Sequence, residues 1–279
     1  KRHDMSKIIT AAQAAEFVKD GCTLTTTGFN GFGCPEDLIM SLAEHFDQTG
    51  HPKDVTLVKC TSQGDGEGRG VSHLAAKDGL FKELILTHMG YDPGLRELVQ
   101  GEKVTCYMLP LGNMMQLFRA IAGGLPGAIA TTGIGTFADP RNGGGKANQK
   151  TLDSGKNVVL LLKLDGKECL YYPSFPIDVC FIRATYGDEA GNLSIVNEAM
   201  NVEQFEVAAA VHNSGGIVIA QVDKIVRRGT IPAKEVLIHG FMVDYLVEGR
   251  PEYSKQSFET DQFRPEIAGL AVTPAAGFE

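Results

Sequence analysis

The segment at residues 20–35 reads Asp20-Gly-Cys-Thr-Leu24-Thr-Thr-Thr-Gly28-Phe-Asn-Gly31-Phe-Gly33-Cys-Pro35. Its β-branched run over residues 22–29 is typical of a strand. The three glycines then predict a bend. Pro35 is favoured in the first turn of a helix that the apolar spacing extends to residue 46. The segment therefore predicts a strand, a glycine-rich loop and a helix in succession.

The same succession of elements recurs through the first half of the chain. A helix at residues 11–20, capped by Thr10, precedes the first strand. Further units follow as strand 55–60 with loop 61–70, strand 84–87 with helix 94–100, and strand 104–109 with helix 113–122. Strands that alternate with helices are typical of a parallel sheet covered on both faces. We therefore expect an α/β fold, with an open, mainly parallel sheet and helices on both faces.

The pattern changes after residue 127. A glycine-rich loop at residues 133–146 is followed by two apolar runs, 158–164 and 168–172, and the Asp165-Gly166 turn between them predicts a β-hairpin. The sheet is expected to be completed by strands 179–184, 217–226 and 236–247 and by a helix near 202–211. These elements predict one domain at residues 8–247. Residues 1–7 read as an N-terminal tail, and the polar, proline-bearing residues 248–279 as an extension or linker toward a second half.

Composition excludes several function classes. The formal net charge is −8, so the chain would repel nucleic acid. Its six cysteines are widely spaced and form no Cys-x-x-Cys pair, which is typical of reduced thiols in a cytoplasmic protein. Neither a signal-peptide core nor a run of eighteen apolar residues is present. We expect a cytoplasmic protein with no nucleic-acid or membrane partner.

Common catalytic signatures are missing from the sequence. The histidines lack the spacing of zinc sites, so no metal site is predicted. Gly28-x-x-Gly31-x-Gly33 reverses the dinucleotide fingerprint, and Gly145-Lys146 is followed by alanine where a P-loop needs Ser or Thr. There is no Gly-x-Ser-x-Gly elbow. Dinucleotide binding, nucleotide hydrolysis and serine hydrolysis therefore have no support.

Three glycine-rich loops follow predicted strands, at residues 28–35, 61–70 and 133–145. Open α/β sheets bind ligands at the carboxyl ends of their strands, where glycines let backbone N–H groups approach a carboxylate or thioester oxygen. Taken singly, each loop is explained equally well by tight turns alone. Together they favour one shared pocket, with the three loops close to one another.

The segment at residues 20–35 resembles the alpha-side signature of family I coenzyme A transferases, with Thr27 as the departure from the usual Gly-Gly-Phe core. From about residue 8 to residue 247 the chain is similar to the propionate (acetyl-CoA) branch of that family. The matching motifs are Ser62-Gln-Gly64, Gly68-Arg-Gly70, His88, the run 133–146, Tyr171-Tyr-Pro173, Asp188-Glu-x-Gly-Asn192 and Asn213-Ser-Gly-Gly216.

This resemblance implies an enzyme built from two halves of one fold. Acyl transfer would proceed by ping-pong through a glutamyl-CoA thioester on a glutamate of a complementary beta-type half, and coenzyme A would enter as the acyl-CoA substrate with no cofactor permanently bound. Further homo-oligomerisation is expected. Glu189 and Glu198 read as a turn residue and a helix-start charge. The chain is therefore assigned no catalytic residue and is expected to be inactive without the second half.

The resemblance also implies an acyl and carboxylate pocket for short-chain substrates. Leu111 stands where related enzymes carry a glutamine thought to donate to the reacting carbonyl, and loss of one such donor costs about 3 kcal/mol of barrier. Donation would then fall to the Gly112 or Gly31 amide or to Gln63, unless Leu111 is simply a core residue at a strand end. The predicted substrate-binding residues are Gly28, Phe29, Asn30, Gly31, Ser62, Gln63, Leu111, Gly112, Gly133, Gly135 and Thr136.

Two other functions are compatible with this type of fold. A sugar-phosphate isomerase or deaminase would need an acid and a base beside a phosphate-binding loop, and no clear pair is present. A non-catalytic ligand-binding or assembly module is favoured by Leu111 and by the missing glutamate. Both alternatives stay open from the residues alone.

Overall fold

The computed structural model describes residues 7–272, and its main feature is an eight-stranded sheet. Seven strands run in the order β11-β10-β8-β1-β2-β3-β4, and every neighbouring pair among them is parallel. Only the short β9 pairs antiparallel, with β8. The strands are β1 (Thr23–Thr26), β2 (Val55–Val58), β3 (Phe81–Leu86), β4 (Thr105–Met108), β8 (Val179–Asp188), β9 (Leu193–Ser194), β10 (Ile217–Val226) and β11 (Tyr245–Glu248).

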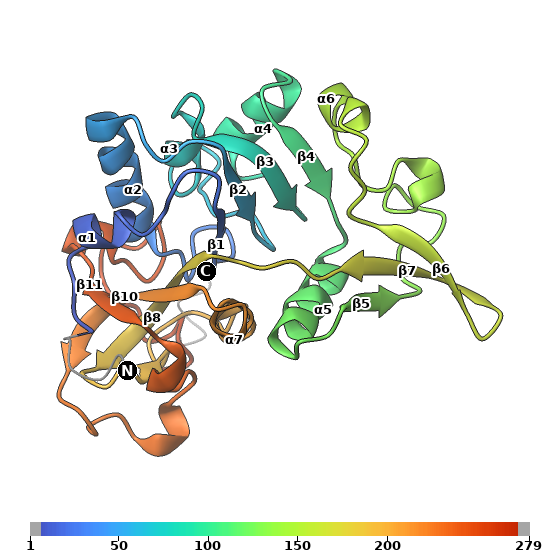
Figure 1. Cartoon of the computed structure of the whole chain (residues 1–279). Coiled ribbons are helices and arrows are strands. Elements are labelled where there is room, and N and C mark those ends of the chain that lie inside the picture. Colours follow the sequence, from blue (N-terminus) through green and yellow to red (C-terminus); the bar gives the residue numbers. More distant parts are fainter. Residues whose placement is uncertain (1–6, 273–279) are drawn as a thin grey trace.

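Helices cover both faces of this sheet, as the alternation of elements predicts (Figure 1). Successive strand residues point to opposite faces, so Leu57 and Val58 enter different hydrophobic clusters. The Leu57 cluster is covered by α1 (Ala11–Ala15), α2 (Glu36–Thr49), α3 (Ser72–Ala75) and α4 (Pro93–Gln100). The Val58 cluster is covered by α5 (Leu111–Ala122) and α7 (Gln204–Asn213).

The predicted hairpin forms, but it does not join the main sheet. Asp165 and Gly166 both have positive φ, 46° and 77°, as the tight turn requires. A separate antiparallel sheet beside α5 has β7 (Lys167–Pro173) at its centre, paired with β6 (Leu160–Leu164) on one side and with β5 (Gly127–Ala130) on the other (Figure 1). Its inner face, with Leu170 and Tyr172, packs in the same cluster as α5. That packing gives the hairpin a layer of its own.

The lengths of several predicted elements were wrong. The strand expected at 22–29 is shorter, as β1, and the strand expected at 179–184 is longer, as β8. The first helix and the strand expected at 236–247 differ most. Phe17 and Val18 donate to the carbonyls three residues earlier, so the first helix tightens and ends at Ala15, although Thr10 and Gln13 form the capping box. The expected strand 236–247 is a strand only from Tyr245, because Gly240 packs against Ala190 and starts a 3₁₀ turn. Short elements not predicted are α3, β5, β9, α6 (Gln149–Asp153), η1 (Pro140–Asn142), η2 (Ala233–Glu235), η3 (Gly240–Met242) and η4 (Pro251–Tyr253).

The segment after β11 packs back on the domain. Arg250 binds Asp37 at 2.6 Å, and the Phe258 amide donates to the Gly31 carbonyl at 3.2 Å. The described part of the expected extension is therefore attached to α2 and to the first glycine-rich loop. Residues 1–6 of the expected tail and 273–279 of the extension lie outside the described residues.

Candidate functional site

The first glycine-rich loop leaves the carboxyl end of β1 and rests on the second loop. Gly28 has φ 142°, a region that favours glycine, and a Cβ there would lie 3.2 Å from the Phe32 carbonyl. Its own carbonyl accepts a hydrogen bond from the Thr61 hydroxyl. The Asn30 amide donates to the Ser62 carbonyl at 2.7 Å. Two of the three predicted loops are therefore in contact, as the sequence predicted.

Ser62 connects the second loop to the segment after β3. Its buried hydroxyl lies 2.8 Å from His88 Nδ1 and accepts from the Tyr91 amide at 3.2 Å. This joins the carboxyl ends of β2 and β3, and β1 is joined to them through the first loop. The carboxyl ends of three neighbouring parallel strands are thus tied together at one edge.

The Gln63 side chain takes part in this network of hydrogen bonds and does not face solvent. The side chain is fully buried, its carbonyl oxygen accepts from the Thr26 hydroxyl, and its amide donates to the Thr26 carbonyl at 2.8 Å. Because both polar ends are engaged, the structure does not favour Gln63 as a free donor to a substrate. It holds the second loop against β1.

Beneath these loops lies a buried ion pair that the sequence analysis missed. Lys59 and Asp92 have fully buried side chains, with Nζ 2.7 Å from Oδ2. The other two Lys59 protons are directed to the carbonyls of Thr61, at 2.6 Å, and His88, at 3.1 Å. Asp92 Oδ1 accepts from the backbone N–H of Gln63 at 2.9 Å. Burial lowers the pKa of Lys59 and Asp92 opposes that shift. Three acceptors for three protons favour the ammonium form.

The third loop lies near the start of α5, at the carboxyl end of β4. A Cβ on Gly133 would lie 3.0 Å from Leu170 and 3.6 Å from Pro110. The Gly135 amide donates to Asp139 at 2.8 Å, and the Thr136 hydroxyl donates to the Gly133 carbonyl at 2.7 Å. Asn113 of α5 donates to the Thr132 carbonyl at 3.0 Å. These bonds fix the loop beside the first turn of α5.

Leu111 and Gly112 begin α5 and are exposed. Leu111 is 46% exposed, so the alternative that it is a core residue was wrong. A Cβ on Gly112 would meet nothing within 4 Å. The Asn113 and Met114 amides donate to the Pro110 carbonyl, both at 3.0 Å, so the amides that this turn presents at the carboxyl edge of the sheet are those of Leu111 and Gly112.

The predicted site residues fall into two clusters along that edge. Gly28, Phe29, Asn30 and Gly31 belong to the first loop, which meets the second loop, with Ser62 and Gln63, through the Asn30–Ser62 and Gly28–Thr61 hydrogen bonds. Leu111 and Gly112 adjoin the Gly133 loop at the end of β4. The third loop contacts the start of α5, and β3 lies between the two clusters. The expected contact is therefore confirmed for the first two loops, whereas the third loop lies further along the same edge.

Glu203 is a second group that sequence reasoning missed. It precedes α7, is 3% exposed, and accepts from the Gly28 amide at 3.3 Å. Burial raises the pKa of Glu203 to about 7, opposed by its hydrogen bond from Gly28 and by the charge of Lys59. The sequence did carry a signal for each missed residue. Glu203 is a carboxyl directly before an apolar helix, and Lys59 is a charge directly after an apolar strand.

The segment after β11 closes over the first loop. A Cβ on Gly31 would lie 3.1 Å from the Phe258 side chain. Arg69 stacks on the Phe258 ring at 4.3 Å and donates to Glu36 at 2.9 Å. Phe258 is thereby held over the tip of the loop.

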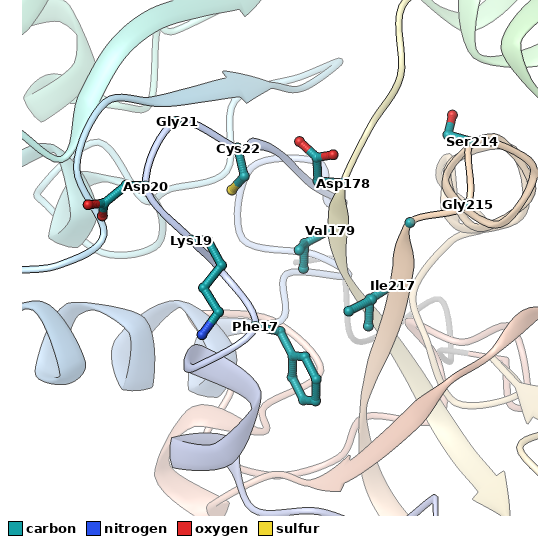
Figure 2. A pocket seen from close by; sticks show the side chains of 11 residues that line it. Phe17, Lys19, Asp20, Gly21, Cys22, Asp178, Val179, Ser214, Gly215 and Ile217 are labelled. Carbon is teal, nitrogen blue, oxygen red and sulfur yellow. The ribbon is translucent and has the colours of Figure 1, made fainter. Parts of the chain in front are cut away.

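A cavity of about 460 Å³ lies at the opposite ends of the strands (Figure 2). It is lined by Cys22, Val179 and Ile217, which stand at the starts of β1, β8 and β10. Asp178 at its rim accepts from the Thr23 amide at 2.7 Å. The glycine-rich loops lie at the carboxyl ends of the strands, so this cavity is at the other edge of the sheet and is separate from the candidate site.

Two absences hold for residues 7–272. No group of three or more His, Cys, Asp or Glu side chains is placed to hold a metal ion. None of the helices in that range combines the length and apolar character that crossing a membrane requires.

Residues 8–249 match the family model for coenzyme A transferase. The chain belongs to the coenzyme A transferase family. Its eight-stranded, mainly parallel sheet with helices on both faces also matches the fold of an acyl-CoA transferase of known structure.

The relatives of this coenzyme A transferase chain are of two lengths. Caffeate CoA-transferase of Acetobacterium woodii is 38% identical over 265 residues, which cover 95% of this chain and 50% of that protein. Acetate CoA-transferase subunit alpha of Escherichia coli K12 is 26% identical over 243 residues, which cover 87% of this chain and 96% of the subunit. An acyl-CoA transferase (YdiF) of Escherichia coli O157:H7, solved as a thioester complex with CoA, matches with TM-score 0.89 and 36% identity over 94% of this chain and 50% of that one. The chain thus spans about half the length of its longer relatives and nearly all of an alpha subunit.

Glu189 and Glu198 both have structural partners in this chain. Glu189 accepts from the Arg228 amide at 3.1 Å in the turn after β8, as predicted. Glu198 is not at a helix start: it is buried and pairs with the buried Arg183 at 3.1 Å. The charge of that arginine is compensated there.

Proposed function

We propose that this chain is the alpha half of an acyl-CoA:carboxylate CoA-transferase that acts on short-chain acyl groups. The observation that carries the proposal is the match of residues 8–249 to the family, on a fold that places glycine-rich loops at one sheet edge. The relative solved as a thioester complex with CoA supports coenzyme A as the carrier.

In the proposed reaction, a glutamate carboxylate of the other half attacks the acyl thioester carbonyl, which forms a mixed anhydride and releases the CoA thiolate. The thiolate then attacks the glutamyl carbonyl of the anhydride, so a glutamyl-CoA thioester forms and the acyl group leaves as a carboxylate that carries a glutamate oxygen. A second carboxylate repeats the two steps in reverse, receives CoA and regenerates the glutamate. Each exchange develops negative charge on a carbonyl oxygen. The contribution of this chain is backbone N–H groups at the first loop and at Gly112, which donate to that oxygen.

The proposed partner is a beta-type half that docks on exposed apolar side chains. Ile129, Tyr171 and Leu160 form one cross-strand row on the small sheet, and Ile129 and Leu160 are exposed. Leu164, on the same face as Leu160, and Leu111 are exposed as well. Side chains of this kind mark protein contacts when they lie together. Further homo-oligomerisation of the complete enzyme remains part of the proposal.

The test is reconstitution. Alone, this chain should transfer no CoA from acetyl-CoA or propionyl-CoA to a short carboxylate, because it supplies no glutamate nucleophile. Mixing with the beta half should restore transfer and trap a CoA thioester on that half, detectable by mass. The beta half alone is the control. Acyl-CoA binding by the reconstituted pair without any transfer would favour the alternative, a non-catalytic binding module.

Leu111→Gln tests whether the first turn of α5 lies beside the reacting carbonyl. Because Leu111 is exposed, the free energy of unfolding should change by less than about 0.5 kcal/mol. In the reconstituted enzyme kcat should be preserved or raised, by up to about tenfold for one added hydrogen bond. Leu125→Gln, at another exposed leucine, is the matched control. A loss of transfer in Leu111→Gln alone would show that the pocket needs an apolar side chain there.

A further inference from the structure

The turn before α7 lies directly under the first glycine-rich loop. Glu203 Oε1 accepts from the Gly28 amide at 3.3 Å. A Cβ on Gly33 would lie 3.4 Å from Val202 and 3.7 Å from Gln204. Gln204 in turn accepts from the Val202 amide at 2.9 Å, which stiffens the turn. The first and last glycines of the loop therefore both rest on residues 202–204.

Both backbone polar groups of Gly28 are hydrogen-bonded. Its amide is directed to Glu203 and its carbonyl to the Thr61 hydroxyl. This residue is the hinge at which the chain leaves β1, so the direction of its peptide planes sets where the tip of the loop points. Glu203 controls one of those two planes.

We propose that Glu203 is a positioning residue for the substrate loop: its buried carboxyl holds the Gly28 amide and so orients the backbone N–H groups of Gly31 and Gly33. This inference rests on the proposed function for what the loop binds. The support itself is a feature of the fold and does not depend on CoA transfer.

The charge on Glu203 changes how firmly it holds the loop. The titratable groups that act on Glu203 are Lys59 and Cys60, which directly follow β2, and Glu206 in α7. Lys59 is committed to Asp92, and Glu206 pairs with Arg119 at 3.0 Å. An ionised carboxylate accepts a hydrogen bond more strongly than a protonated one. Burial raises the pKa of Glu203 to about 7, and the hydrogen bond from Gly28 opposes that rise because it favours the ionised carboxyl. This hydrogen bond should therefore hold the loop more tightly above pH 7.

The test is hydrogen exchange of the full chain, followed by mass spectrometry between pH 6 and pH 8 and corrected for the intrinsic pH dependence of exchange. In the wild type, protection of residues 28–33 should rise about five- to tenfold across this range. Glu203→Gln keeps an acceptor without a charge and should show less than about a twofold rise. Residues 81–86 of β3 serve as the internal control.

Equal pH dependence in wild type and variant would overturn the proposal. If Glu203→Gln does not fold, the wild-type profile decides: a flat profile at residues 28–33 refutes it. In the reconstituted enzyme, the pH profile of kcat/KM should lose its limb near pH 7 in Glu203→Gln. Absence of CoA transfer in every protein, with the exchange profile as expected, would reject the proposed function and leave the positioning role standing.

Discussion

Lys59→Met should lower the free energy of unfolding by about 3–5 kcal/mol, because it leaves the Asp92 carboxylate buried without a partner. The expectation rests on two fully buried side chains joined at 2.7 Å. Two backbone carbonyls, those of Thr61 and His88, also lose their donor. Urea unfolding followed by far-UV circular dichroism measures the change.

Two variants make this test specific. Lys234→Met, at an exposed lysine, should leave the unfolding midpoint almost unchanged. The double variant Lys59→Met/Asp92→Asn removes the stranded charge and keeps an acceptor for the Gln63 amide, so it should recover at least about 1 kcal/mol relative to Lys59→Met. A double variant that is less stable than the single one would show that the pair does not act as a compensated charge.

The pH dependence of stability should carry the signature of Glu203. Its pKa is raised from 4.5 to about 7 in the folded protein, so the folded state binds more protons than the unfolded state between these two values. The free energy of unfolding should therefore fall as pH rises from about 4.5 to about 7, and level off above that. The shift corresponds to a change of up to about 3 kcal/mol.

Glu203→Gln isolates this contribution, because glutamine does not titrate. Asp223, whose pKa burial raises to about 6, contributes to the slope in both proteins and cancels in the difference. The variant should gain stability relative to the wild type as pH rises from 5 to 8, measured by urea unfolding at each pH. Glu235→Gln, at an exposed glutamate, is the matched control. Parallel curves for wild type and Glu203→Gln would mean that the carboxyl is solvated in solution.

The sequence by itself determined the succession of strands and helices along the chain, the hairpin and the positions of the glycine-rich loops, although it predicted that all three loops lie close together. Local chemistry is sufficient for these features. Periodicity of apolar residues separates strands from helices, Asp165-Gly166 supplies the positive φ of a tight turn, and Pro35 marks a helix start. The family signature lies in these same local stretches, and the match of residues 8–249 confirms it.

Only the tertiary structure decided what supports the candidate site. Lys59 meets Asp92 across 33 residues of sequence, and Glu203 meets Gly28 across 175. The exposure of Leu111 depends on how α5 leaves β4, and the end of the predicted strand 236–247 depends on Gly240 packing against Ala190. No local pattern encodes such contacts, because they arise where distant segments are buried together and must satisfy one another's charges and hydrogen bonds.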